Sequence, residues 1–214
     1  MRIYAVADIH SRGDREKKAL DYASSSDLAI ICGDITHFGP PDHARQFLDE
    51  LCSEVRTIAV PGNCDPPEII GAIEESAAIN LHNAALEFGE VFFFGYGGSV
   101  PGMIRTIFEI PEETIYEDLK RIAKKGGVMV THVPPRGHMD LTNFGNRIGS
   151  SSVLRIVDEF SPVLHLFGHV HEAAGKERYN GTQLINCSAG HEGYGCYIDL
   201  DGGEVKTIEF IENF

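Results

Sequence analysis

Seven residues of metal-binding type stand at five places along the chain, and each place follows a run of apolar residues. They are Asp8, His10, Asp34, Asn63, His132, His169 and His171. Carboxylate, amide and imidazole groups suit borderline divalent cations such as Mn, Fe, Ni or Zn. Because the set contains no thiolate, a structural zinc site is disfavoured. The residue types therefore predict a centre for divalent cations with carboxylate, amide and imidazole ligands.

These residues need a common edge if they are to meet. We predict that the apolar runs before them are buried strands. The runs are Ile3–Ala7, Leu28–Cys32, Thr57–Val60, Val128–Thr131 and Val163–Phe167. In open α/β sheets, ligands bind beyond the carboxyl ends of the strands. The placement of the seven residues just past the strand ends thus predicts one shared site.

Two pairs of these residues share an i, i+2 spacing. Asp8 and His10 form the first pair, and His169 and His171 form the second. On an extended segment, residues two apart project to the same side. We therefore expect each pair to direct both side chains toward one site.

The segments between the strands indicate the fold class. Helices are predicted at Asp14–Ala23, His43–Leu51, Glu68–Glu75, Glu112–Lys125 and Ser150–Glu159. Alternating strands and helices favour parallel sheets with helical cover. The region after Ala85 is richer in β-structure, and residues 95–102, with four glycines, are predicted to form a loop. We predict an α/β fold in which two mixed β-sheets pack face to face with helices on the outside, an α/β/β/α sandwich formed by one domain over residues 1–214.

Charge and composition restrict the partners. The chain carries 18 Lys and Arg against 32 Asp and Glu, a formal net charge of −14. Such a surface repels an anionic membrane and the nucleic-acid backbone, so we expect neither membrane association nor non-specific nucleic-acid binding. Bound cations can still attract a small phosphate ester inside a cleft. Five cysteines without a C-x-x-C pair, and no recognisable signal peptide, predict a cytoplasmic protein of undetermined oligomeric state.

The ordered motifs resemble those of the calcineurin-like metallophosphoesterase superfamily, in its small single-domain bacterial and archaeal branch. They are Asp8-x-His10, Gly33-Asp34, Gly62-Asn63-Cys64-Asp65, Thr131-His132 and Gly168-His169-Val170-His171. The resemblance implies two divalent metal ions, most simply Mn, with Fe, Ni or Zn as alternatives. One ion would take Asp8, His10 and His171, the other would take Asn63, His132 and His169, and Asp34 would bridge them. A metal-bridging hydroxide would then attack the phosphate ester in line.

One position departs from the family pattern. Many members carry histidine after the Gly-Asn pair, thought to protonate the leaving group, whereas this chain has Cys64. A thiol with a pKa of about 8.5 is a poorer acid than imidazole. We therefore expect either a substrate with an easier leaving group or a proton donor from elsewhere, for which His37 and His191 are candidates. Asn63 and Asp34 are the other candidate catalytic groups, and the role of Asp65 is left open.

Other functions share this pattern. A phosphodiesterase is favoured, but a phosphomonoesterase or a nucleotide pyrophosphatase would use the same ligands. A non-catalytic protein-binding scaffold on the same fold would not need to keep all seven. Arg105, Arg136 and Arg147 lie in predicted loops and are either phosphate contacts or surface residues.

Overall fold

The structure is a computed structural model that describes residues 1–102, 105–189 and 193–212. Over these residues the chain forms two six-stranded sheets. The first contains, in spatial order, β12 (Glu204–Glu212), β11 (Gly193–Asp201), β1 (Arg2–Val6), β2 (Leu28–Cys32), β3 (Thr57–Val60) and β4 (Ile79–Asn80). The second contains β5 (Ala84–Phe88), β6 (Val91–Tyr96), β7 (Val128–Thr131), β8 (Leu164–Phe167), β10 (Thr182–Asn186) and β9 (Gly175–Tyr179).

Both sheets are mixed, with a parallel centre. Strands β1 to β4 run parallel, while β11 pairs antiparallel with β1, and β12 with β11. In the second sheet β6, β7, β8 and β10 run parallel, while β5 and β9 are antiparallel edge strands. The carboxyl ends of the central strands therefore meet at one end of each sheet.

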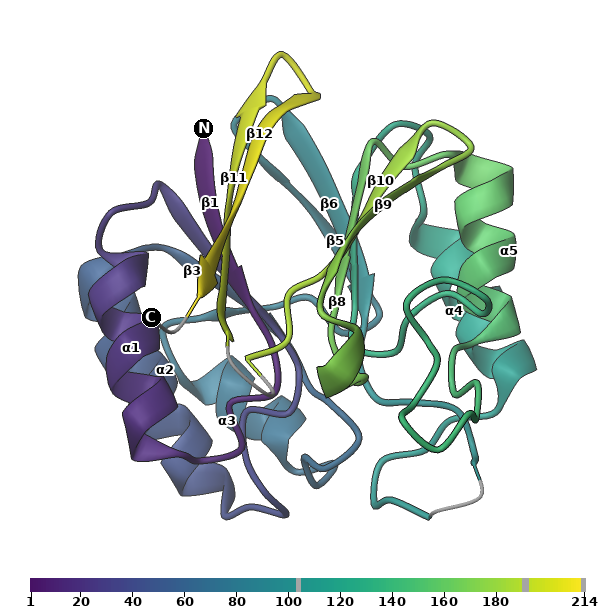
Figure 1. Cartoon of the computed structure of the whole chain (residues 1–214). Helices are drawn as coiled ribbons and strands as arrows, with labels where there is room; N and C mark the ends of the chain where they lie inside the picture. Colours follow the sequence, from purple (N-terminus) through teal and green to yellow (C-terminus); the bar gives the residue numbers. More distant parts are fainter. Residues whose placement is uncertain (103–104, 190–192, 213–214) are drawn as a thin grey trace.

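The helices cover the outer faces of the two sheets (Figure 1). Helices α1 (Gly13–Ala23), α2 (Pro41–Glu54) and α3 (Ile69–Glu75) pack on the first sheet. Helices α4 (Glu112–Ile122) and α5 (Ser151–Phe160) pack on the second, and a short 3₁₀ helix, η1 (His171–Ala173), follows β8. This is the predicted sandwich of two face-to-face mixed sheets between helical layers.

Strand β2 shows why its sequence is continuously apolar. Leu28, Ile30 and Cys32 face the core between the two sheets, whereas Ala29 and Ile31 face the helices. Because both faces are buried, no polar alternation is needed. The predicted bounds of β2, β3 and β7 agree with the structure.

The segment predicted as a glycine-rich loop begins two residues too early. Strand β6 continues through Gly95 and Tyr96, which pair with Val130 and Thr131 of β7. A Cβ at Gly95 would lie 2.7 Å from the carbonyl oxygen of Val130, so this glycine allows close approach of the two strands.

Among the residues that the structure describes, no helix is both long enough and apolar enough to span a membrane.

Candidate metal centre

The loops after β1 and β2 are joined by backbone hydrogen bonds. The amide of Asp8 donates to the Gly33 carbonyl at 3.0 Å, and the amide of His10 donates to the Asp34 carbonyl at 2.9 Å. Asp8, His10 and Asp34 all have positive φ, at 62°, 56° and 51°. The prediction that Asp8 and His10 converge because their segment is extended is therefore wrong. They converge because a left-handed turn, held against the next loop, redirects the chain.

The second sheet supplies three histidines to the same place. His132 follows β7 and His169 follows β8, while His171 begins η1. The amide of Gly168 donates to the His132 carbonyl at 3.0 Å, and the amide of His169 donates to Asp8 Oδ2 at 3.1 Å. His169 also has a positive φ, of 71°, so this pair is not extended either. The Asp8 carboxylate thus connects the two sheets at their carboxyl ends.

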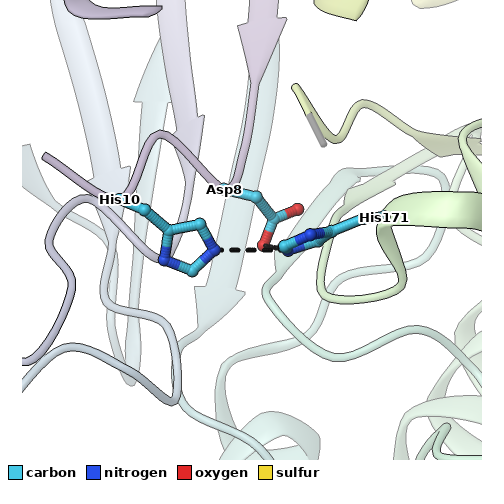
Figure 2. Close-up of side chains that lie close together, drawn as sticks. All are labelled: Asp8, His10 and His171. Atoms are coloured by element: carbon cyan, nitrogen blue, oxygen red, sulfur yellow. Dashed lines mark hydrogen bonds and ion pairs between the residues drawn. The ribbon is translucent and has the colours of Figure 1, made fainter. Parts of the chain in front are cut away.

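One cluster of ligand atoms contains Asp8, His10 and His171 (Figure 2). The Nε2 atoms of His10 and His171 lie 3.2 Å apart, and His171 Nε2 lies 3.4 Å from Asp8 Oδ1. Two ligands about 2.1 Å from one ion are separated by about 3.0–3.4 Å at octahedral or tetrahedral angles. The separations of these atoms fit a shared divalent cation.

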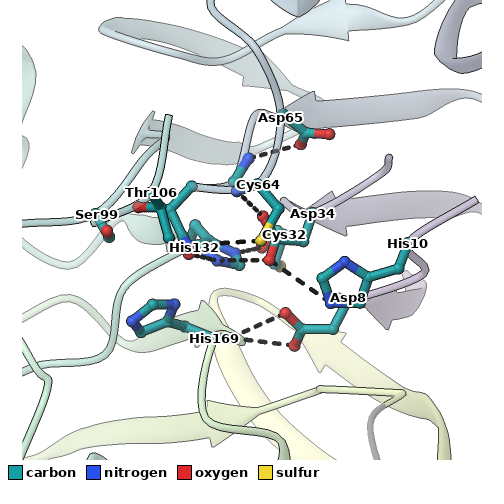
Figure 3. A network of polar contacts seen from close by, with 12 residues as sticks. Asp8, His10, Cys32, Asp34, Cys64, Asp65, Ser99, Thr106, His132 and His169 are labelled. Carbon is teal, nitrogen blue, oxygen red and sulfur yellow. Dashed lines mark hydrogen bonds and ion pairs between the residues drawn. The ribbon is translucent and has the colours of Figure 1, made fainter. Parts of the chain in front are cut away.

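A second cluster surrounds His132, which is fully buried (Figure 3). Its Nδ1 contacts the Cys32 carbonyl oxygen at 2.9 Å, and its Nε2 lies 2.8 Å from Asn63 Oδ1. A carbonyl oxygen can only accept a hydrogen bond, so Nδ1 carries the proton. When the ring is neutral, Nε2 therefore carries a lone pair. That lone pair faces the Asn63 oxygen. The ring of His169 lies beside that of His132, with 5.1 Å between their centroids.

Asp34 lies between the two clusters. Its Oδ2 is 3.7 Å from His10 Nε2 and 3.5 Å from His132 Nε2, while its Oδ1 accepts a hydrogen bond from the Cys64 amide at 2.8 Å. A Cβ at Gly62 would lie 2.0 Å from Asp34 Oδ1, so only glycine leaves room for this carboxylate. One oxygen of Asp34 is thereby directed at ligands from both sheets.

The electrostatics of the site favour cations. Burial, with the nearby charges of Asp8 and Asp65, raises the pKa of Asp34 to about 7. Burial lowers the pKa of His10 to about 4 and, with the charge of His132, lowers the pKa of His169 to about 3. The pKa of Asp8 is lowered despite its burial, because His171 bonds to it and His132 lies nearby. The hydrogen bond with Asp8 instead raises the pKa of His171. Imidazoles with a low pKa beside crowded carboxylates suit a divalent cation.

A pocket of about 620 Å³ opens over these ligands. Its lining comprises His10, Arg12, Arg15, Asp34, His37, Asn63, Cys64, His169 and His171. Asp8 and His132 have no exposed surface. The structure thus brings all seven predicted ligands together, and it places His37 on the pocket wall, with its ring 5.6 Å from that of His10. His191 lies outside the described residues.

Asp65 has a role that sequence reasoning left open. Its Oδ1 accepts from the amide and hydroxyl of Thr36, and its Oδ2 accepts from the amides of Ile35 and Gly62. Burial raises the pKa of Asp65, while these hydrogen bonds oppose that shift. The carboxylate joins the loop that carries Asp34 to the loop that carries Asn63. The sequence did not reveal that Asp65, two residues after Asn63, is fully buried.

Cys64 occupies the position of the family histidine, at the pocket wall. Its thiol lies within 4.8 Å of ligand atoms of His10 and Asp34. Burial and the charge of Asp34 raise the pKa of Cys64. The thiol therefore stays protonated near neutral pH and transfers its proton poorly.

Two pocket arginines, Arg12 and Arg15, were also missed by the sequence reasoning. Their proximity to His10 in sequence was the available signal. Of the loop arginines considered instead, Arg147 pairs with Asp140 at 2.5 Å. Within the described residues, Arg105 and Arg136 are likewise not part of the pocket lining.

Comparison with known proteins identifies the family of this chain. The family model for calcineurin-like phosphoesterases matches residues 1–173. The uncharacterized protein MJ1162 of Methanocaldococcus jannaschii is 30% identical over 88% of each chain. Human metallophosphoesterase domain-containing protein 1 is 29% identical over 87% of this chain and 65% of its own length. The crystal structure of TT1561 of Thermus thermophilus matches 99% of this chain and 98% of its own, at 16% identity and a TM-score of 0.76. The chain belongs to the calcineurin-like phosphoesterase family, and its ligand clusters support a metal-dependent phosphoesterase.

Proposed function

We propose that the protein is a phosphodiesterase with two divalent metal ions. In this proposal Asp8, His10 and His171 hold one ion, and Asn63, His132 and His169 hold the other. Asp34 is shared between them. Two such ions would lower the pKa of water to give a nucleophile and would offset charge on the phosphoryl oxygens.

The arrangement around His132 is the main support for this proposal. Its Nε2 lone pair faces Asn63 Oδ1 at 2.8 Å and Asp34 Oδ2 at 3.5 Å. When the His132 ring is neutral, these three acceptor atoms repel one another, and the two oxygen ligands are almost completely buried. A cation among them removes the repulsion. The Nε2 atoms of His10 and His171 lie 3.2 Å apart, a separation that a shared cation would fit.

The pocket supports a small diester as the substrate. Its volume of about 620 Å³ can hold substituents on both sides of a phosphate. The net charge of −14 opposes long polyanions, so we infer a small substrate. The preferred metal in this proposal is Mn, with Ni, Fe or Zn as alternatives.

His37 is the proposed acid for the leaving group. It lies on the pocket wall with an exposed side chain, beside the His10 ring. Since burial and the charge of Asp34 raise the pKa of the Cys64 thiol, imidazole is the better proton donor of the two. His37 would donate its proton to the departing alkoxide.

Hydrolysis of bis-p-nitrophenyl phosphate beside p-nitrophenyl phosphate tests the proposed activity. Metals are first removed with a chelator, and Mn, Ni, Zn or Mg is then added back singly. We expect activity to vanish without metal and to return with Mn or Ni, with the diester cleaved at least about tenfold faster. Metal content measured on the same samples should approach two ions per chain.

Each other outcome has a distinct meaning. Faster monoester cleavage would replace the diesterase by a phosphatase on the same ligands. No turnover with two ions bound would favour a non-catalytic scaffold. Turnover that survives complete metal removal would contradict the metal-dependent mechanism itself.

The role of His37 predicts a dependence on the leaving group. His37→Gln should lower kcat roughly 100-fold for a diester with an alkyl leaving group, because an alkoxide must be protonated as it leaves. For p-nitrophenyl esters, whose leaving group is stable as an anion, the loss should be small. The measurement is kcat for both ester types in the variant and the unmodified protein.

His43→Gln is the matched control, because His43 pairs with Glu16 on the helical side and is not in the pocket lining. It should leave both rates nearly unchanged. Equal losses on both ester types in His37→Gln would assign His37 to binding and not to proton transfer.

A further inference from the structure

Two arginine side chains belong to the lining of the pocket. Arg12 and Arg15 line it together with the ligands His10 and His171. Both follow His10 closely in the chain, and Arg15 lies in the first turn of α1. Their placement beside a centre for cations needs an explanation.

Arg15 is fixed in place by the metal-centre loop. Its Nη1 donates to the carbonyl oxygen of Asp8 at 2.6 Å, and its side chain is partly buried. The side chain of Arg15 therefore lies beside the Asp8 loop and lines the same pocket as the metal ligands.

Arg12 is held more loosely. Its Nε and Nη2 atoms lie 3.3 and 3.4 Å from the carboxylate of Asp14, and both side chains are more than half exposed. An exposed ion pair of this kind contributes little free energy. Arg12 can therefore exchange Asp14 for an anion in the pocket at small cost.

Positive side chains beside divalent cations repel them. Arg12 pairs with Asp14 and Arg15 bonds to the Asp8 carbonyl oxygen, yet both side chains line the pocket that the metal ligands line. The repulsion is removed when an anion lies between the arginines and the ions. A phosphodiester bound to the metals carries one negative charge, which those ions already neutralise.

We propose that Arg12 and Arg15 form a subsite for a second phosphate group of the substrate, a terminal monoester. This inference rests on the proposed phosphodiesterase function and names its substrate class, a phosphodiester that carries a free phosphate. Two guanidiniums match the nearly double charge of a phosphate monoester better than the single charge of a carboxylate. Their planar donors also fit phosphate oxygens in pairs.

A pair of chromogenic substrates tests the subsite. The first is a thymidine p-nitrophenyl phosphodiester with a free phosphate on its other hydroxyl, and the second lacks only that phosphate. We expect the unmodified protein to prefer the phosphorylated compound in kcat/KM by roughly tenfold or more. Two variants should each reduce this preference at least threefold. They are Arg12→Ala and Arg15→Lys, and the second keeps the positive charge but loses the paired guanidinium donors.

The ratio is the readout because misfolding or poor metal loading lowers both rates equally. Arg45→Ala is the matched control, since Arg45 pairs with Asp42 on α2 much as Arg12 pairs with Asp14. It should keep the preference. An unmodified protein that cleaves both compounds equally, or variants with the full preference, would overturn the subsite while leaving the diesterase intact.

Titration calorimetry with thymidine bisphosphate and with thymidine monophosphate tests the subsite independently of turnover. It is measured with and without Mn. Tighter binding of the bisphosphate that is lost in Arg12→Ala supports the subsite even if neither chromogenic compound is cleaved. Equal affinities of the two nucleotides would refute it.

Discussion

Asp34→Asn should lower phosphoesterase activity at least about 1000-fold, equivalent to about 4 kcal/mol of transition-state stabilisation. Asp34 Oδ2 is directed at His10 and His132, which belong to different ligand clusters. In the variant, the retained oxygen can still accept from the Cys64 amide, so an NH₂ group would take the place of Oδ2. That group would donate to the imidazole lone pairs and exclude cations. Initial rates and metal content per chain measure both effects.

The fold should survive this change because the amide is isosteric with the carboxylate. Asp118→Asn provides the control, since Asp118 is a partly exposed aspartate that bonds Tyr96 and Arg121 outside the pocket. It should retain activity and bound metal. Full turnover by Asp34→Asn with two ions bound would refute the shared-ligand role.

Asp65→Asn is expected to destabilise the protein by about 3 kcal/mol. Each carboxylate oxygen accepts two hydrogen bonds, so an amide NH₂ in either orientation must face two donors. For a chain of this length the melting temperature should fall by roughly 6–12 °C. Thermal unfolding followed by circular dichroism, without added metal, measures the change.

Asp27→Asn is the comparison for this variant. Asp27 is exposed, and its carboxylate accepts one hydrogen bond from the Arg2 amide at 2.7 Å, which asparagine can replace. We expect a change within about 0.5 kcal/mol. If both variants melt at the temperature of the unmodified protein, the carboxylate of Asp65 does not join the two loops as described.

The sequence was most predictive where local composition decides the structure. Strands β2, β3 and β7 are short apolar runs with polar or glycine residues at their ends, and their bounds were predicted correctly. Strand β4 was not predicted, because its two residues, Ile79 and Asn80, carry no periodic pattern. It forms through pairing with β3, which is a tertiary effect.

The candidate site shows the same division. Residue types and strand ends predicted seven side chains that the structure brings together, whereas their grouping around two ions stays a prediction from the family resemblance. The left-handed turns at Asp8 and His10 were not predictable, since they depend on hydrogen bonds to the next loop. The position of Arg15 on the pocket wall likewise depends on its bond to the Asp8 carbonyl, a contact that spacing alone does not reveal.

The left-handed residues of the site set protein stability against activity. Five residues of the site have φ between 51° and 71°, namely Asp8, His10, Ser11, Asp34 and His169. Residues other than glycine are strained in this conformation by about 1–3 kcal/mol each. Glycine at any of these positions would relax the backbone, but at four of them it would delete a proposed ligand. Selection for thermal stability alone would therefore erode the centre. A stabilised version of this protein is better sought in the helices, with these five positions held constant.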